Sequence, residues 1–216
     1  MKRYASPVAE LVFTLIGDLV ASRRAPSRSA TQRALTTALA RTRAIVPVVD
    51  RLEPTVGDEF QGTFSSLADA TLAALLVRLS LGAAGDARCG IGAGAREVFD
   101  AGRTPLLQDG PAWWAARAAV DRLSTPAHRL QRTWYDPGDD GPPAAPVNAF
   151  LLTRDALVDR LNARSRSMLA GALGGSSQKE IAAAEGVSES AVSQAFARGV
   201  GAVREAQAVF AAQGRR

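Results

Sequence analysis

The stretch RLEPTVGDEFQGTF, from Arg51 to Phe64, decides the fold of this chain. Strand-forming residues lie on both sides of Gly57 and Asp58, and glycine accepts a positive φ angle at no steric cost, so the stretch predicts a tight β-hairpin. The tip carries adjacent carboxylates, Asp58 and Glu59. Neighbouring like charges favour a cation close by, usually a divalent ion, although a solvated turn has the same Gly-Asp dipeptide.

A second Gly-Asp pair, Gly17 and Asp18, ends a strand-like run over residues 9–16. A polar loop and a predicted helix over residues 28–46 follow it. If this strand pairs with the hairpin, Asp18 and Asp58 converge on one edge of a sheet. The two carboxylates could then share one or two Mg²⁺ (or Mn²⁺) ions.

The remaining patterns up to residue 136 alternate between helix and strand. A serine and acid spacing at Ser66 predicts a helix start. The predicted elements are a helix over 67–81, a glycine-rich strand over 87–95, a loop over 100–108, a helix over 112–123 and a strand over 129–135. The order is βαββαβαβ, which predicts an α+β fold with a mixed sheet in a ferredoxin-like or palm arrangement.

A segment rich in proline, glycine and acids covers residues 137–147. Such composition is typical of a linker between domains. We therefore predict a sheet domain over residues 1–136 and a small all-α domain over residues 148–216.

The whole composition describes a globular chain of 216 residues, 47% apolar, with a net charge of +5. Cys89 is the one cysteine, which excludes an intrachain disulfide and a cysteine-based zinc site. The apolar run near the N-terminus covers only residues 11–16, too short for an export signal. No stretch approaches the roughly 20 residues of a membrane span, so we expect a cytoplasmic protein with no membrane partner.

The C-terminal segment has the spacing of a helix-turn-helix motif. A helix over 154–173 is followed by a capping box at Ser177 and Glu180, a short helix to Glu185, a turn at Gly186 and a longer helix over 189–206. The apolar residues expected to meet inside are Ile181, Ala184, Val187 and Val192. A helical dimerisation domain shares this apolar pattern.

In a helix-turn-helix motif the start of the second helix enters the major groove of duplex DNA. The residues that this places at the DNA are Ser188, Glu189, Ser190, Ser193, Gln194 and Arg198. Gln194 is suited to adenine, and Arg198 to phosphate or guanine. The segment carries nine basic and six acidic residues, a net charge of about +3. A single copy should therefore bind weakly, and we expect a homodimer.

Four groups of residues together resemble the SatD family, a bacterial family of poorly defined function, and more distantly the nucleotidyl and diguanylate cyclase domains. They are Gly17-Asp18 with Ser22-Arg23, residues 57–62, residues 88–94, and residues 109–112 with Ala116-Arg117. The resemblance implies that Asp18 and Asp58 are metal ligands. It implies that the nucleotide lies against Gly17, Ser22, Arg23, Gly57 and Glu59.

The same resemblance makes Arg117 the residue that stabilises charge on the phosphates, although a surface arginine on a helix would look the same. Trp113 stands where purine nucleotide cyclases carry asparagine, and Val56 replaces the first glycine of the diguanylate cyclase signature. Both departures speak against cyclisation. The hypothesis is a DNA-binding regulator with a Mg²⁺-dependent nucleotide sensor; the alternatives are an active nucleotidyl transferase or cyclase, and a non-catalytic interaction scaffold.

Overall fold

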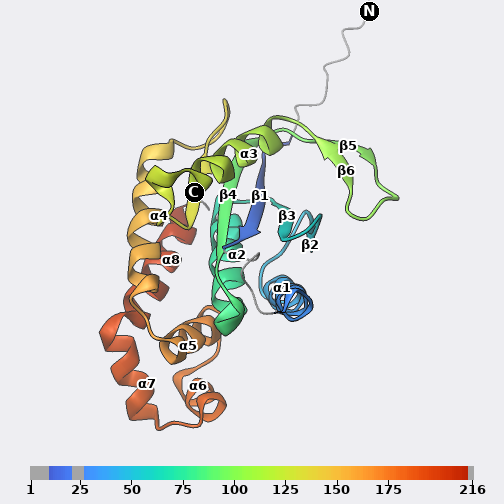
Figure 1. Ribbon diagram of the computed structural model, residues 1–216. Helices are drawn as coiled ribbons and strands as arrows, with labels where there is room; N and C mark the ends of the chain where they lie inside the picture. The colour runs from blue at the N-terminus through green and yellow to red at the C-terminus, as the bar shows by residue number, and fades with distance from the viewer. Residues whose placement is uncertain (1–9, 21–26, 214–216) are drawn as a thin grey trace, which may run out of the picture.

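The computed structural model describes residues 10–20 and 27–213 (Figure 1). Its sheet is built from β1 (Val12–Leu19), β2 (Asp50–Pro54), β3 (Glu59–Phe64), β4 (Ala87–Gly94) and β7 (Thr133–Asp136). The helices between these strands are α1 (Arg28–Arg43), α2 (Leu67–Leu81) and α3 (Pro111–Ser124). Five more follow: α4 (Ala144–Asp159), α5 (Ala163–Leu173), α6 (Gln178–Glu185), α7 (Glu189–Ala195) and α8 (Gly201–Gln213).

The five strands form one mixed sheet in the order β2-β3-β1-β4-β7. Strand β1 lies at its centre and pairs antiparallel with both β3 and β4, whereas β4 and β7 are parallel. The predicted hairpin is present, because β2 and β3 pair antiparallel across a turn in which Gly57 has a φ angle of 72°. The α+β class and the mixed sheet are therefore confirmed.

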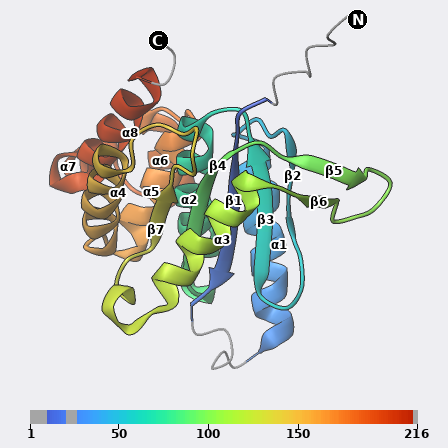
Figure 2. The same cartoon turned by 90° about the horizontal axis from the view of Figure 1, so that it is seen from above.

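The predicted loop over residues 100–108 was wrong in part. Strands β5 (Glu97–Asp100) and β6 (Leu107–Asp109) pair antiparallel as a separate two-stranded arm that projects from the body of the molecule (Figure 2). The strands have four and three residues. Runs this short carry too little alternation for sequence analysis to separate them from a loop.

A glycine seam on β4 sets how closely α3 packs against the sheet. A Cβ atom at Gly90 would lie 2.4 Å from the carbonyl oxygen of Ala116, and one at Gly92 would lie 2.2 Å from the backbone nitrogen of the same residue. Backbone contact at this distance is open only to glycine. The seam thus holds α3, which carries Arg117, in a fixed position over the strand.

Helix α2 is the centre of the hydrophobic core. It contacts α1 and the sheet on one side and α5 and α8 on the other. Within the described residues, the stretch Leu67–Ala84 has the length and mean hydropathy of a membrane span, yet most of it is buried inside the molecule. A core helix of a globular domain can have the same length and hydropathy, and the packing of α2 shows that it is a helix of this kind.

The C-terminal helices begin and end differently from the prediction. The helix expected over residues 154–173 is two helices, α4 and α5, because Asn162 starts a new helix by accepting a hydrogen bond from the Ser165 backbone N–H. The helix expected over 189–206 is also interrupted: a π-helical turn covers Phe196–Val200, and Gly199 has a φ angle of 134° there. Such a left-handed angle favours glycine and breaks the helix.

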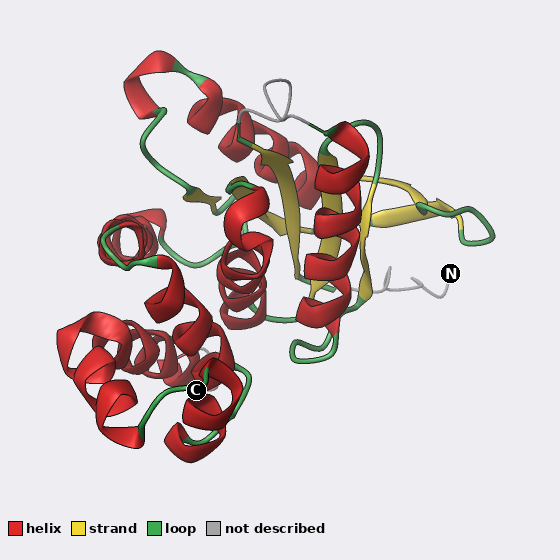
Figure 3. Cartoon of the chain, turned by 60° about the horizontal axis from the view of Figure 1, so that its bottom comes forward, coloured by secondary structure: helices red, strands yellow, loops and turns green. Residues whose placement is uncertain are grey.

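The segment 137–147 turns back onto the sheet, and its last residues already belong to α4. Tyr135 donates a hydrogen bond from its hydroxyl to the Pro142 carbonyl, and the Asn148 side chain bonds both backbone groups of Tyr135. Helix α4 contacts β7, and α8 contacts α2, α4 and α5. The helices that lead to the C-terminus gather on one side of the sheet (Figure 3).

Candidate functional site

The two Gly-Asp pairs meet where β1 and the hairpin lie side by side. In the antiparallel register Asp18 on β1 faces Glu59 on β3, and on its other side it faces Arg88 on β4. Asp58 precedes Glu59 at the hairpin tip, and its charge acts on Asp18. We call Arg88, Asp18, Glu59 and Arg117 the charged row. The first three lie side by side on β4, β1 and β3, and Arg117 reaches Glu59 from α3.

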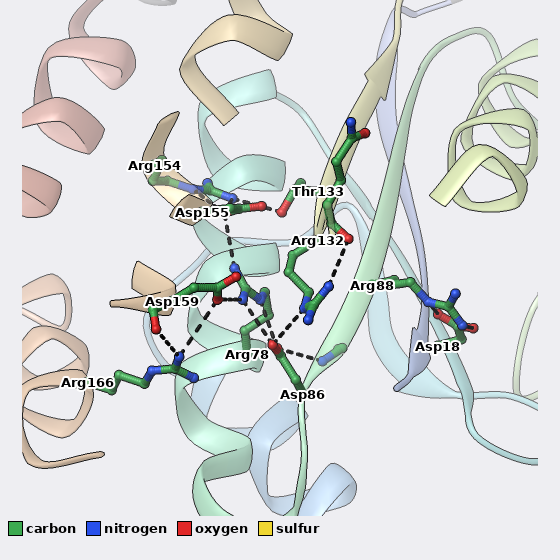
Figure 4. Close-up of polar contacts among 12 residues, drawn as sticks. Asp18, Arg78, Asp86, Arg88, Arg132, Thr133, Arg154, Asp155, Asp159 and Arg166 are labelled. Carbon is green, nitrogen blue, oxygen red and sulfur yellow. Dashed lines mark hydrogen bonds and ion pairs between the residues drawn. The ribbon is translucent and has the colours of Figure 1, made fainter. Parts of the chain in front are cut away.

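The first ion pair of the charged row joins Arg88 to Asp18 (Figure 4). Arg88 donates from Nε and Nη2 to the two carboxylate oxygens at 3.1 and 2.8 Å. Burial raises the pKa of Asp18 above its usual value, Arg88 offsets this in part, and the charges of Asp58 and Glu59 raise the pKa further. The pKa of Asp18 is therefore raised mainly by burial, and the ion pair with Arg88 offsets this rise only in part.

The second ion pair of the charged row joins Arg117 on α3 to Glu59. Arg117 donates from both Nη atoms to the two Glu59 oxygens at 2.8 and 2.9 Å. The hydrogen bonds to Glu59 raise the pKa of the guanidinium further above its usual value. In this conformation both Nη atoms of Arg117 are bound to Glu59, and the side chain of Arg117 is 47% exposed.

Gly17 has a packing reason to be glycine. A Cβ atom there would lie 2.2 Å from Cζ of Phe60, whose ring covers the strand. Larger residues are excluded at this position whatever ligand the site takes. Ser22 and Arg23, the other predicted contacts near the strand end, lie outside the described residues.

The residue types of the site fit a divalent cation, but their arrangement does so only in part. Carboxylate oxygens are the ligands that Mg²⁺ and Mn²⁺ prefer, and Asp18, Asp58 and Glu59 supply three carboxylates. Both oxygens of Asp18 and of Glu59 are engaged by guanidinium groups, however. Within the described part of the chain no set of three or more acidic, histidine or cysteine side chains is arranged to hold a metal ion.

A small cavity of about 70 Å³ opens beside the hairpin tip. Its lining residues are Leu19, Arg28, Thr31, Gln32, Gly57 and Asp58. The first turn of α1 thus stands opposite Asp58, and that turn contains Arg28 and no acid. The N-terminal end of a helix carries partial positive charge, which adds to that of Arg28.

The two departures from the cyclase patterns have different surroundings. Trp113 is buried against Ile16 and Val120 beneath α3 and acts as a core residue. Val56 at the hairpin turn is 88% exposed. A buried tryptophan cannot take the part of an asparagine that reaches a ligand.

The short helices α6 and α7 are capped and joined as their sequence predicts. Ser177 and Glu180 form a reciprocal capping box at the start of α6, and Gly186 ends the helix in a left-handed conformation. Met168 of α5, Ile181 and Val192 are buried together, with Val187 packed against them. Ala184, predicted inside, is exposed, and its neighbour Ala182 is buried instead.

The six residues predicted to face DNA are all exposed on or next to α7. Ser188 caps the helix by accepting a hydrogen bond from the Ala191 backbone N–H, so its hydroxyl already has a structural partner. Gln194 lies in the last turn of α7, and Arg198 lies in the π-helical turn that follows it. Glu189, in the first turn of α7, is the one acidic residue among these six.

A second polar cluster, centred on the buried side chains of Arg78 and Arg154, was missed by the sequence analysis. Its members are Arg78, Asp86, Arg132, Arg154, Asp155 and Asp159, which we call the buried network (Figure 4). Arg78 contacts three aspartates at 2.8 to 3.1 Å, and its side chain is 1% exposed. Arg154 donates to Asp155, to the Thr71 carbonyl and to the Thr133 hydroxyl.

One signal in the sequence could have indicated the buried network. Arg78 stands inside the apolar run of α2, where eleven of fifteen helix residues are buried. A charged residue in such a run must find a partner, because an unpaired buried charge is very costly. The sequence cannot show that the partners come from Asp86, Asp155 and Asp159.

The fold and the site together define an α+β protein with a mixed sheet, a charged row at the end of its central strands and a group of short capped helices packed on one side. The family whose model matches the chain is the SatD family, over residues 12–197, and the chain belongs to this family. No curated protein matches it.

Two solved structures, each of a bacterial light-regulated adenylyl cyclase, resemble the fold at a distance. One has a TM-score of 0.45 at 10% identity, covering 61% of this chain and 44% of its own. The other has a TM-score of 0.45 at 11% identity, covering 60% of this chain and 77% of its own. The chain thus spans less than half of the first and about three quarters of the second.

Proposed function

We propose that this SatD-family protein is a DNA-binding regulator whose sheet domain senses a nucleotide. The observation that carries the proposal is the surface of α7. Six polar residues stand exposed on or next to a helix that is capped at its start, preceded by the left-handed Gly186 turn and supported from behind by α5 and α6. A helix-turn-helix motif presents its second helix to the major groove in this manner.

Two side chains of this surface have separate roles. Gln194 reads a base, because its amide both donates and accepts and so matches adenine. Arg198 binds phosphate, because it lies beyond the last turn of α7 and is exposed. Since Glu189 opposes DNA and one copy carries little positive charge, two copies reading two half-sites about one helical turn apart supply the affinity.

The sheet domain contributes the nucleotide site at the charged row. Three carboxylates, two arginines and the start of α1 stand around the hairpin tip. Asp18 and Asp58 would hold Mg²⁺, which when bound neutralises phosphate charge. Glu59, Gly57 and Gly17 would shape the edge of the site. Ser22 and Arg23, which the sequence also assigns to it, lie outside the described residues.

The second candidate function is an active nucleotidyl transferase or cyclase. It is favoured by Arg117, which reaches the row from α3 and could turn from Glu59 to a phosphate. It is disfavoured by Trp113, which is buried where the cyclases need a polar side chain. A non-catalytic interaction scaffold is the third candidate function.

Incubation with labelled ATP, GTP, CTP and UTP separates the catalytic function from the other two, since a cyclic or linear product would establish catalysis.

The nucleotide site is tested by the thermal stabilisation of the full chain with a panel of nucleotides, with and without Mg²⁺. We expect a Mg²⁺-dependent rise in melting temperature that Asp58→Asn removes, because an amide keeps the shape and loses the charge that holds the ion. Asp140→Asn, an exposed aspartate in the segment before α4, is the matched control. Equal stabilisation of wild type and Asp58→Asn would show that the site is misassigned.

The DNA surface is tested by recovery of fragmented genomic DNA on the full chain, with and without Mg²⁺-nucleotide. Arg198→Ala should weaken binding to all sequences and lower the salt slope by about one. Gln194→Ala should relax base preference at one position of each half-site, at a cost of about 1–3 kcal/mol. Arg129→Ala in the sheet domain is the control. Without any enriched sequence, α5 to α7 would be a dimerisation or partner-binding module.

A further inference from the structure

A cavity of about 200 Å³ lies beside the projecting arm, on the face of the sheet that α3 covers. Its polar lining residues are Thr55, Gln61, Arg103, Gln108 and Trp113. They come from the hairpin, from the loop and second strand of the arm, and from the first turn of α3. Segments that are separate in the sequence therefore enclose one space.

Three side chains of this cavity have a buried polar atom without a hydrogen-bond partner among the described residues. The atoms are Thr55 Oγ1, Gln108 Oε1 and Trp113 Nε1. Trp113 is only 8% exposed, whereas the exposed Trp114 next to it donates its Nε1–H to Asp109 at 2.7 Å. Buried polar groups in folded proteins nearly always have a partner. Three without one around a single cavity indicate that a molecule from solvent supplies the partners.

A larger cavity differs in this respect. It has a volume of about 810 Å³ and lies between α1, α2, α5 and α6. Among its described lining side chains only Arg78 has such an atom, and this Nη1 lies 3.1 Å from Asp155 Oδ1. Size alone thus does not indicate a polar ligand here, and the unpartnered atoms favour the cavity beside the arm.

The volume and the groups of the cavity restrict the class of ligand. One water occupies about 30 Å³ and a drug-sized ligand needs roughly 300–1,000 Å³, so the cavity suits a single planar ring system. The Trp113 N–H donates, the Gln108 oxygen accepts and the Thr55 hydroxyl does both. One cation, Arg103, and no acid line the cavity, which disfavours a cationic ligand. A nucleobase carries donors and acceptors together without a positive charge.

The cavity also adjoins the charged row along two elements. Gln61 lies two residues beyond Glu59 on β3, and Trp113 lies four residues before Arg117 on α3. Residues at these spacings share one face of a strand or of a helix. Two strand residues span about 6.6 Å and four helix residues about 6 Å, so the two elements give a similar separation. A ring in the cavity can therefore carry a polar group that extends toward Arg117.

We propose that this cavity, which we call the base cavity, binds the nucleobase of the ligand that the sheet domain senses. Gln108 and Thr55 bind the polar edge of the ring, and Trp113 donates its Nε1–H to a ring acceptor. The indole ring itself stays in the core against Ile16. The identity of the ligand rests on the proposed nucleotide function, whereas the base cavity needs neither a metal ion nor a phosphate.

The first arm of the test titrates the full chain with adenosine, guanosine, cytidine and uridine in the absence of a divalent cation. The Nε1–H magnetic resonance signal of Trp113, assigned by its loss in Trp113→Phe, should shift with at least one nucleoside because it gains an acceptor. The signal of Trp134, which stacks under Arg122, is the reference and should not shift. No Trp113 shift with any nucleoside would overturn the base cavity.

The second arm measures nucleoside affinity and the melting temperature of the unliganded chain in two variants. Gln108→Met and Thr55→Val keep the approximate shape of the side chain and remove the unpartnered atom. Each should weaken binding about fivefold. Neither should lower the melting temperature, because the lost atom has no partner in the unliganded protein. Gln178→Met, an exposed glutamine at the start of α6, is the control and should change neither quantity.

Two results of the second arm would contradict the proposal. Unchanged nucleoside affinity in both cavity variants would show that their side chains do not contact the ligand. A loss of affinity that comes with a lower melting temperature would show that the two residues have a structural role instead.

The two arms also separate the base cavity from the proposed nucleotide sensor. If a nucleotide with Mg²⁺ raises the melting temperature and leaves the Trp113 signal unchanged, the sensor stands and the base cavity is wrong. If nucleosides shift the Trp113 signal and neither Mg²⁺ nor phosphate groups strengthen binding, the base cavity stands and the metal-dependent site at the charged row is wrong.

Discussion

The charged row and the buried network both consist of arginine–carboxylate pairs, but the two groups have different roles. In the row, bidentate arginine–carboxylate pairs lie near solvent at the end of the sheet. In the network, Arg78 and Arg154 are almost wholly buried between α2, β7 and α4. Exposed ion pairs contribute little to stability and exchange readily with ligands, whereas breaking one partner of a buried pair is costly. The difference separates pairs that can open from pairs that hold the molecule together.

The buried network also explains how the C-terminal helices are attached. Asp155 and Asp159 on α4 reach Arg78 on α2, and Arg154 reaches Thr71 on α2 and Thr133 on β7. On the far side of the same region, the Gln207 side chain of α8 donates to the Thr71 hydroxyl. The sheet and the helices therefore share one polar interface as well as apolar packing.

The largest expected effect is that of Arg154→Met. The substitution removes one of the two arginine partners of Asp155, the other being Arg78, and the donor to the Thr71 carbonyl and the Thr133 hydroxyl. Breaking a buried pair in this way should lower the free energy of unfolding by about 3–5 kcal/mol. Urea unfolding of the full chain measures it. Arg160→Met, an exposed arginine just beyond α4, is the control and should cost about 0.5 kcal/mol or less. A loss below about 1 kcal/mol for Arg154→Met would show that the network contributes little net stability.

The next effect concerns the glycine seam that positions Arg117. In Gly92→Ala the added Cβ would meet the backbone of α3 at 2.2 Å, so the helix must move away from β4. Overpacking of this kind should cost about 1–3 kcal/mol, measured by urea unfolding. Gly102→Ala in the projecting arm, where the nearest atom is an Asp100 side-chain oxygen at 3.4 Å, is the control. Equal stability of the two variants would contradict backbone contact between α3 and β4.

The two regions should respond to acid in opposite directions. Burial and the nearby carboxylates raise the pKa of Asp18 above 3.8, so the folded state binds this proton more tightly and its contribution to stability grows as pH falls through the raised pKa. Burial alone would raise the pKa of Asp86 too, but hydrogen bonds from Arg78, the Ala87 N–H and Arg132 lower it below 3.8. Its contribution is present above 3.8 and is lost as pH falls through the lowered pKa.

Urea unfolding of wild type, Asp18→Asn and Asp86→Asn between neutral pH and about pH 3 tests this contrast. The stability of wild type relative to Asp18→Asn should rise on acidification from neutral pH. The stability of wild type relative to Asp86→Asn should fall, and only at the acid end of the range. Slopes of the same sign would contradict the assignment of the two environments.

The smallest expected effect is that of Arg117→Ala. Its ion pair with Glu59 is partly exposed, so the free energy of unfolding should change by less than about 1 kcal/mol. A double-mutant cycle with Glu59→Ala isolates the pair, and its coupling energy should fall further at high salt. A coupling energy above about 2 kcal/mol would place this pair with the buried ones.

Much of the fold could be predicted because it depends on local sequence patterns. The hairpin at Gly57 follows from a residue that accepts a positive φ angle, and α6 follows from the capping box at Ser177 and Glu180. The arm formed by β5 and β6 could not be predicted, because its strands are too short to show a period. The break at Gly199 was missed for a related reason. An isolated glycine in an amphipathic pattern lowers the stability of a helix but does not by itself predict that the helix ends there.

The sequence by itself determined most of the elements of the main sheet, their order and the acids that could form a site, since turn, cap and strand preferences depend on a few neighbouring residues. Only the tertiary structure decided the partners of those acids. It paired Asp18 with Arg88 and Glu59 with Arg117. It also brought Asp155, distant in sequence, to Arg78 and Asp86, which are eight residues apart. The physical reason is that the partner of a charged side chain depends on which groups lie close to it and how deeply the pair is buried. Both follow from the packing of the sheet and the helices, and the residues next to it in sequence do not specify them.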